Sequence, residues 1–285
     1  MPTIYSHDEA VAAYTSYTSY IKLLHLAQPG PRWTLKYPPP GDWPQITEED
    51  FACDGTTDVA LEFMRHIPQW EDDGPEFIPN LGLVSYLNPA LIKSQREHSE
   101  EMRQSRSQPE PDVPGHLVCL GSNQGETEDY FNVYLDTKHG LVLVEQIDYK
   151  LMPDLGIPEC ERGDSDDFDG EEFWDQYEYP DPLAFKISED AEVHYEFYDI
   201  KPFFEACERK LRSLEWCPSF RGRGGLVADE GPWLDRAAVE ERRGIMRDTG
   251  WPAETWNKPV AQWIIRELDG ERDWDAEDIF GPAPD

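Results

Sequence analysis

Six acidic side chains lie close together around residue 168, and clustered carboxylates are first of all a candidate cation site. They are Asp164, Asp166, Asp167, Asp169, Glu171 and Glu172. Calcium prefers oxygen ligands of this kind. If Gly170 takes the place of the invariant glycine of an EF-hand, the last ligand position falls on Gln176, which cannot chelate with two oxygens as glutamate does. The sequence therefore predicts no EF-hand and leaves open a looser cation site or a solvated acidic surface.

Other motifs that carry chemistry are incomplete in this chain. The run Gly121–Gly125 has its serine one place too early for a nucleophile elbow. His194 and Glu196 match the H-x-E of zinc deaminases, but no P-C-x-x-C follows them. The run Arg221–Gly225 lacks the Lys-Ser/Thr pair of a phosphate-binding loop. We therefore predict no catalytic residue, no metal ligand and no cofactor.

Scattered carboxylates keep an enzymatic alternative open. Asp136, Glu145 and Asp148 lie in or beside predicted strands, and a hydrolase can use such groups as acid and base. Carboxylates on strands are usually just solvated, so a non-catalytic role is the preferred interpretation.

The net charge of −34 is concentrated in one segment that is also rich in aromatic residues. Residues 154–199 hold 17 acids, two bases and nine aromatic residues, Phe173, Trp174 and Tyr177 among them. A negative field opposes binding to nucleic acid and to anionic membranes, and it attracts basic proteins. The segment, above all residues 159–178, therefore predicts a partner-binding surface. A mimic of the nucleic-acid duplex is a further alternative.

Composition predicts a folded intracellular protein of one or two domains. Only 39% of residues are hydrophobic, but the 35 Trp, Tyr and Phe residues (10 + 13 + 12) can build a core, because each ring buries roughly 150–250 Å². Five widely spaced cysteines, Cys119 and Cys207 among them, predict buried thiols rather than disulfides. We find no signal segment and no long apolar run, which favours the cytoplasm or the nucleus.

Periodicity predicts a helix over residues 7–27, with Tyr14, Tyr17, Ile21 and Leu24 on its apolar side. A proline-rich arm follows, to residue 46. Thr47 is a candidate cap for the next helix, and another helix should end before Pro68. Residues 77–92 are expected to be irregular, with one short strand at most.

Alternation predicts three antiparallel strands within residues 116–147. A helix with an apolar face follows at 200–214 and should pack on this sheet. Residues 218–232 are predicted to be a loop, and two further helices are expected at 235–248 and 254–268. The acidic tail, 269–285, is expected to fray.

The predicted sheet and the helix after it resemble the core of the SUKH superfamily, over about residues 58–216. The residues that carry the resemblance are His116–Ser122, the loop at Gly125, Phe131–Asp136, Gly140–Val144, and the supporting segments Phe63–Pro68, Phe203–Leu211 and Arg247–Pro252. This superfamily includes SMI-type fungal regulators of cell-wall assembly and bacterial immunity proteins that neutralise toxins. The resemblance implies an α+β fold, no cofactor and a protein-binding role.

The sequence thus predicts one α+β domain with an antiparallel sheet flanked by helices. Its core spans about residues 47–216, and a helical extension spans 233–268. The predicted function is a non-catalytic module that binds a basic protein partner, with no role for nucleic acid or membrane.

Overall fold

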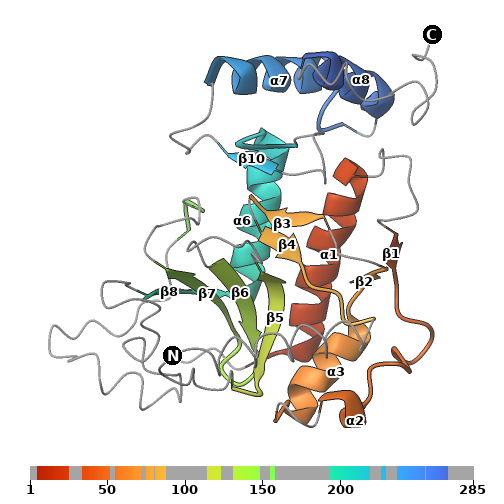
Figure 1. The fold of residues 1–285 in the computed structure, drawn as a ribbon, viewed down its shortest axis with the longest axis vertical. Helices are drawn as coiled ribbons and strands as arrows, with labels where there is room; N and C mark the ends of the chain where they lie inside the picture. The colour runs from red at the N-terminus through yellow and green to blue at the C-terminus, as the bar shows by residue number, and fades with distance from the viewer. Residues whose placement is uncertain are drawn as a thin grey trace, which may run out of the picture.

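A six-stranded antiparallel sheet lies at the centre of the computed structural model (Figure 1). The structure describes residues 5–25, 34–51, 55–71, 75–79, 81–87, 114–122, 131–147, 155–157, 193–218, 226–228, 236–253 and 255–268. The order of the strands in the sheet follows the chain: β3 (Glu76–Ile78), β4 (Leu81–Leu83), β5 (Leu117–Ser122), β6 (Phe131–Asp136), β7 (Leu141–Ile147) and β8 (Val193–Asp199). The predicted α+β class with an antiparallel sheet is confirmed.

Two small antiparallel pairs and six helices complete the described structure. The pairs join β1 (Leu35–Lys36) to β2 (Gln69–Trp70), and β9 (Trp216–Pro218) to β10 (Leu226–Ala228). The helices are α1 (His7–His25), α2 (Glu48–Phe51), α3 (Asp58–His66), α6 (Ile200–Ser213), α7 (Arg236–Asp248) and α8 (Lys258–Leu268).

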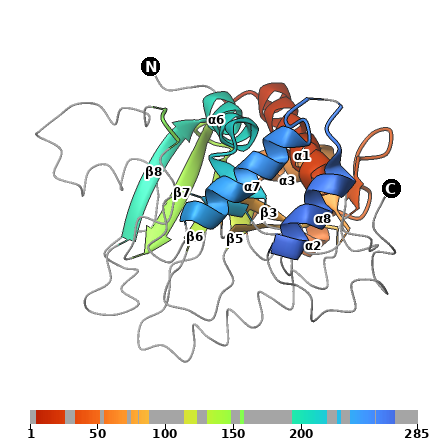
Figure 2. The same cartoon turned by 90° about the horizontal axis from the view of Figure 1, so that it is seen from above.

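Helices α1 and α6 pack along each other on one face of the sheet (Figure 2). The predicted apolar stripe of α1 is confirmed, because Tyr14, Tyr17, Ile21 and Leu24 are all buried. They meet Phe204 of α6, whose ring lies 5.9 Å from that of Tyr14 and 5.8 Å from that of Tyr17. The prediction that the 200–214 helix packs on the sheet is also confirmed.

The predicted cap at Thr47 and the predicted helix end before Pro68 are both confirmed. Thr47 and Asp50 form a capping pair at α2, in which the Asp50 amide donates to Thr47 Oγ1 over 3.3 Å. Helix α3 ends before Pro68, as predicted. Trp43 of the proline-rich arm is buried and its indole N–H donates to Ile67 O over 2.8 Å. Tyr37 of the same arm stays exposed.

Two predictions of irregular structure are wrong. Residues 77–92 contain parts of two strands, β3 and β4, and both belong to the central sheet. Within the loop expected at 218–232, residues 226–228 form β10, which pairs with β9. Each of these strands is three residues long, so its alternation is too brief to identify it.

The largest correction concerns the acidic segment, whose last residues form strand β8. It pairs with β7 from Leu141↔Asp199 to Ile147↔Val193. Phe197 and Tyr198 are buried, and buried Glu196 accepts a hydrogen bond from Tyr198 over 2.7 Å. These three side chains are therefore buried in the sheet and are not available to a partner.

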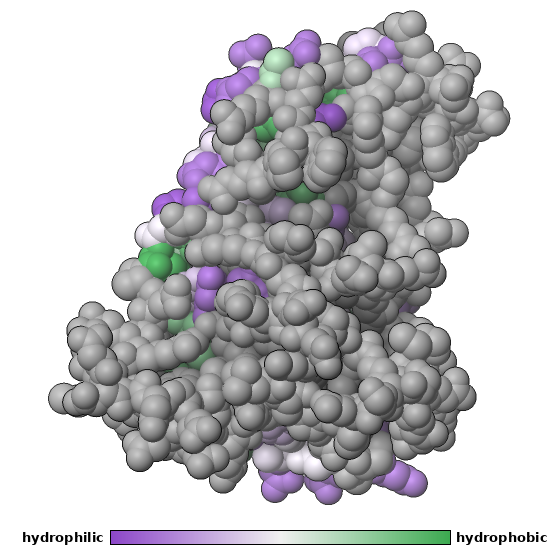
Figure 3. Space-filling view, turned by 60° about the vertical axis from the view of Figure 1, so that its left-hand side comes forward, coloured by the Kyte–Doolittle hydropathy of each residue, from purple (hydrophilic) through white to green (hydrophobic). Residues whose placement is uncertain are grey.

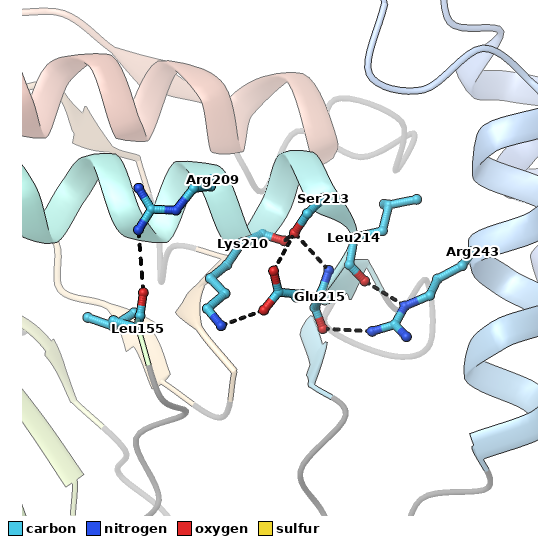
Figure 4. A network of polar contacts seen from close by, with 7 residues as sticks. All are labelled: Leu155, Arg209, Lys210, Ser213, Leu214, Glu215 and Arg243. Atoms are coloured by element: carbon cyan, nitrogen blue, oxygen red, sulfur yellow. Dashed lines mark hydrogen bonds and ion pairs between the residues drawn. The ribbon is translucent and has the colours of Figure 1, made fainter. Parts of the chain in front are cut away.

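The helical pair α7–α8 lies across the C-terminal ends of both α1 and α6, which we call the C-terminal junction (Figures 1 and 2). Helix α6 ends at Leu214, which has a φ of 64°. Arg243 of α7 donates to Leu214 O over 2.7 Å and to Glu215 O over 3.2 Å (Figure 4). Lys258 of α8 donates to Leu23 O near the end of α1. Cations thus lie where helix dipoles are negative.

The surface of the described residues is mainly hydrophilic on the face shown in Figure 3, where hydrophobic areas are small and separate. The large exposed hydrophobic side chains are Leu23, Tyr37, Val59 and Trp263, from four different segments. In the described part of the chain, no helix is long and apolar enough to cross a membrane.

Candidate functional site

The two faces of the central sheet carry different side chains. The inner face, against α1 and α6, is apolar and belongs to the main core: Val118, Leu120, Val133, Leu135, Val142 and Val144. The outer face carries Asn132, Tyr134, Asp136 and Glu145, which are at most 7% exposed. Burying polar groups is costly unless they are hydrogen-bonded. The buried polar side chains of the outer face are therefore the candidate functional residues.

One polar cluster on the outer face joins β6 to β7. Asn132 Nδ2 donates to Glu145 Oε2 and to the Tyr134 hydroxyl, in both cases over 3.0 Å. The Tyr134 hydroxyl also lies 3.5 Å from Glu145 Oε2. These bonds hold the Glu145 carboxylate in place on the sheet.

Cys119 on β5 faces the same cluster, opposite Tyr134. Burial raises the pKa of its thiol to about 12, and the nearby Glu145 carboxylate adds to this shift. Because the thiolate is the reactive form, Cys119 is a poor nucleophile near neutral pH. Cys207 is fully buried in α6, and burial raises its pKa well above the usual value. The prediction of a buried thiol is confirmed for Cys207, whereas Cys119 is only partly buried.

The second polar cluster contains two imidazoles and a carboxylate: His116, Asp136 and His139. His139 Nδ1 lies 2.6 Å from Asp136 Oδ2, and His116 Nε2 lies 3.8 Å from Asp136 Oδ1. The two imidazole rings meet edge to face, with their centroids 5.8 Å apart. Asp136 is completely buried, whereas the His139 side chain is 20% exposed.

The β6–β7 turn positions Asp136 and His139. Asp136 Oδ1 accepts the amide hydrogens of Lys138 and His139 over 2.9 and 3.0 Å, which is a typical Asx turn. Gly140 closes the turn with a φ of 73°, and its amide donates to Asp136 O. Glycine adopts this left-handed conformation without a steric penalty.

A close backbone contact positions His116 just before β5. The Thr57 amide donates to Gly115 O over 2.9 Å, and a Cβ on Gly115 would lie only 1.8 Å from Gly55 O. Only glycine therefore fits at residue 115. Both the amide and the hydroxyl of Thr137 donate to His116 O, which ties this residue to the turn.

The carboxylates of the enzymatic alternative do not converge. Glu145 pairs with Asn132, and Asp136 lies four residues further along β6, about 13 Å away at a rise of ~3.3 Å per residue. Each carboxylate is bonded within its own cluster. Asp148 lies outside the described residues.

All nine predicted partner-binding residues also lie outside the described part of the chain. They are Asp164, Asp166, Asp167, Asp169, Glu171, Glu172, Phe173, Trp174 and Tyr177. Sequence reasoning did not single out His116 and His139. The spacing of Asp136 and His139 in one turn was a local signal for His139. His116 had no such signal, because it is brought to Asp136 by strand pairing between Leu117 and Asp136.

The fold and the two clusters define an α+β protein whose antiparallel sheet is apolar on one face and carries two buried polar clusters on the other. Comparison with protein-family models, with curated proteins and with solved structures finds no match to this chain.

Proposed function

We propose that this chain is a non-catalytic protein-interaction module, of the SUKH type that its sequence resembles, acting in the cytoplasm or nucleus. Its acidic-aromatic segment binds a basic protein partner. The observation that carries the proposal is charge: once β8 is set apart, residues 154–192 still hold 15 acids and two bases. Such a surface speeds the encounter with a basic partner and selects against acidic ones.

The described side chains support a binding role over a catalytic one. The candidate nucleophile Cys119 is held as a thiol, and Asp136 and Glu145 lie in separate clusters. General acid–base catalysis needs groups that reach one substrate together. The aromatic rings of Phe173, Trp174 and Tyr177 supply the kind of side chain that dominates binding energy at protein interfaces.

Charge reversal tests this proposal. The triple variant Asp166→Lys, Asp167→Lys, Asp169→Lys should lose the basic proteins that the full-length chain captures from a cell extract. A matched control reverses Asp42, Glu205 and Glu241, which are exposed on other segments, and changes the net charge by the same amount. Capture by the wild type and by the control should fall with added salt, because exposed charges are screened.

The proposal is wrong if the segment variant captures the same proteins as the wild type. It is also wrong if both triple variants lose them equally, because net charge rather than the segment would then decide binding.

A further inference from the structure

The His116–Asp136–His139 cluster has the composition of a transition-metal site. Imidazole suits zinc, copper, iron and nickel, and a carboxylate commonly completes such sites. The three ligand atoms all lie within 4.8 Å of one another. They come from two places in the chain, the start of β5 and the β6–β7 turn, which the sheet holds together. We propose that these three residues bind one divalent transition-metal ion, with Zn²⁺ as the best fit.

The distances are close to those that zinc requires. With Zn–N and Zn–O bonds of about 2.0–2.1 Å, ligand atoms at the corners of a tetrahedron are about 3.3 Å apart. The 3.8 Å between His116 Nε2 and Asp136 Oδ1 is slightly longer than this. The 2.6 Å between His139 Nδ1 and Asp136 Oδ2 is shorter and is a hydrogen-bond distance. Metal binding therefore needs these two atoms to move apart by about 0.7 Å.

That movement replaces a proton by the metal. In the hydrogen-bonded state a proton lies between His139 Nδ1 and Asp136 Oδ2. When the metal binds, Nδ1 gives up this proton and both atoms donate a lone pair to the ion, with no change in oxidation state. An imidazolium releases the proton to solvent, whereas a neutral imidazole carries its one proton on Nε2 instead. Protons compete with the metal for these atoms, so binding weakens as the pH falls.

The surroundings favour a well-defined site. Asp136 is held by two backbone amides, so its carboxylate is already oriented toward the imidazoles. Hydrogen bonds to a ligating carboxylate strengthen a metal site in this way. His139 is partly exposed, so an ion can reach the cluster from solvent. Three protein ligands leave a fourth position for water.

A second histidine pair provides a matched control. The rings of His7 and His66 lie 5.1 Å apart, and Glu62 lies 3.4 Å from His66 Nδ1. Glu62 is half exposed, however, and among the described residues no backbone amide orients it, in contrast to Asp136. The proposal therefore predicts that His66 does not contribute to binding.

The test uses the full-length chain, first treated with a chelator and then titrated with Zn²⁺ in a calorimeter. The wild type and the His66→Gln variant should bind one equivalent. The His116→Gln and His139→Gln variants should bind more than about 100-fold more weakly, since even loss of an outer-shell partner costs 10–100-fold. Co²⁺ added in place of zinc should give a visible absorption spectrum that these two variants lack.

His139→Gln keeps a side-chain donor for Asp136, so it should stay folded, and circular dichroism of each variant checks this. The proposal fails if the folded wild type binds no zinc. It also fails if folded His116→Gln and His139→Gln bind as tightly as the wild type, because the cluster would then be a buried ion pair and nothing more.

Discussion

Two regions of the described structure place charged groups out of contact with bulk water and satisfy them in different ways. On the outer face of the sheet these groups are carboxylates, and Asp136 accepts hydrogen bonds from two amides and lies against an imidazole of its own turn. At the C-terminal junction they are cations: Arg243 is buried and Lys258 is partly buried. Arg243 donates to carbonyls just after α6 and Lys258 donates to a carbonyl of α1, 235 residues away in the chain.

This difference predicts different consequences for stability. The outer-face clusters are built into adjacent strands of the central sheet, so weakening them should weaken the whole fold. The junction joins a helical pair to the ends of two helices, so it can open while the sheet stays folded. Proteins often open in such local units. The predictions below test this contrast, starting with the largest effect.

Removing the carboxylate of Asp136 should destabilise the whole protein. Asp136→Ala leaves two part-buried amides and an imidazole without this acceptor, and removing one partner of a buried pair costs about 3–5 kcal/mol. Asp136→Asn retains an acceptor for the amides and should cost much less. Chemical denaturation followed by circular dichroism measures both. A loss below about 1 kcal/mol for Asp136→Ala would show that the turn does not depend on this carboxylate.

Removing the guanidinium of Arg243 should loosen α7 and α8 and leave the sheet intact. Arg243→Met loses the charged donors to Leu214 O and Glu215 O, at a cost of about 1.5–3 kcal/mol. Arg247→Met, at an exposed position of the same helix, is the control. Hydrogen exchange should speed up in α7 and α8 of the Arg243 variant alone. Equal acceleration in β6 and β7 would contradict the contrast between the two regions.

The elements that could be predicted from the sequence are those with a long, regular pattern of apolar residues. The stripe of α1, the face of α6 and the alternation of β6 each extend over several repeats, so their burial could be inferred. Strand β8 was missed because its acids and aromatic residues resemble those of the segment before it. Alternation along β6 separates Asn132 and Tyr134 from the apolar face, but it could not show that their face is buried as well.

The polar contacts could not be predicted because they depend on pairing between distant residues. Asp136 and His116 meet only because β5 and β6 are antiparallel neighbours in a particular register. The contacts of the C-terminal junction are harder still to predict. Arg243 reaches the carbonyl of Leu214, just after α6, only because of the course that the chain takes between the two residues. Single arginines and lysines on a helix carry no signal that distinguishes a cap from a solvated charge.

The smallest expected effect concerns the pH dependence of the junction. Burial lowers the pKa of Lys258 from 10.5 to about 7, against the favourable position of its ammonium near the C-terminal end of α1. Between these two values the unfolded chain binds a proton at this lysine that the folded chain does not. Folding stability should therefore rise with pH across this range, and the contribution of Lys258 should be least favourable below pH 7.

The measurement compares wild type with Lys258→Met, which cannot titrate, by denaturant unfolding at several pH values between 6 and about 10. The difference in unfolding free energy should shift in favour of the wild type as the pH rises. Lys201→Met, at an exposed lysine of α6, should show no such trend. A difference that stays constant would mean that the carbonyl of Leu23 keeps the Lys258 ammonium charged, so that the junction buries its cations as stably as the outer face buries its carboxylates.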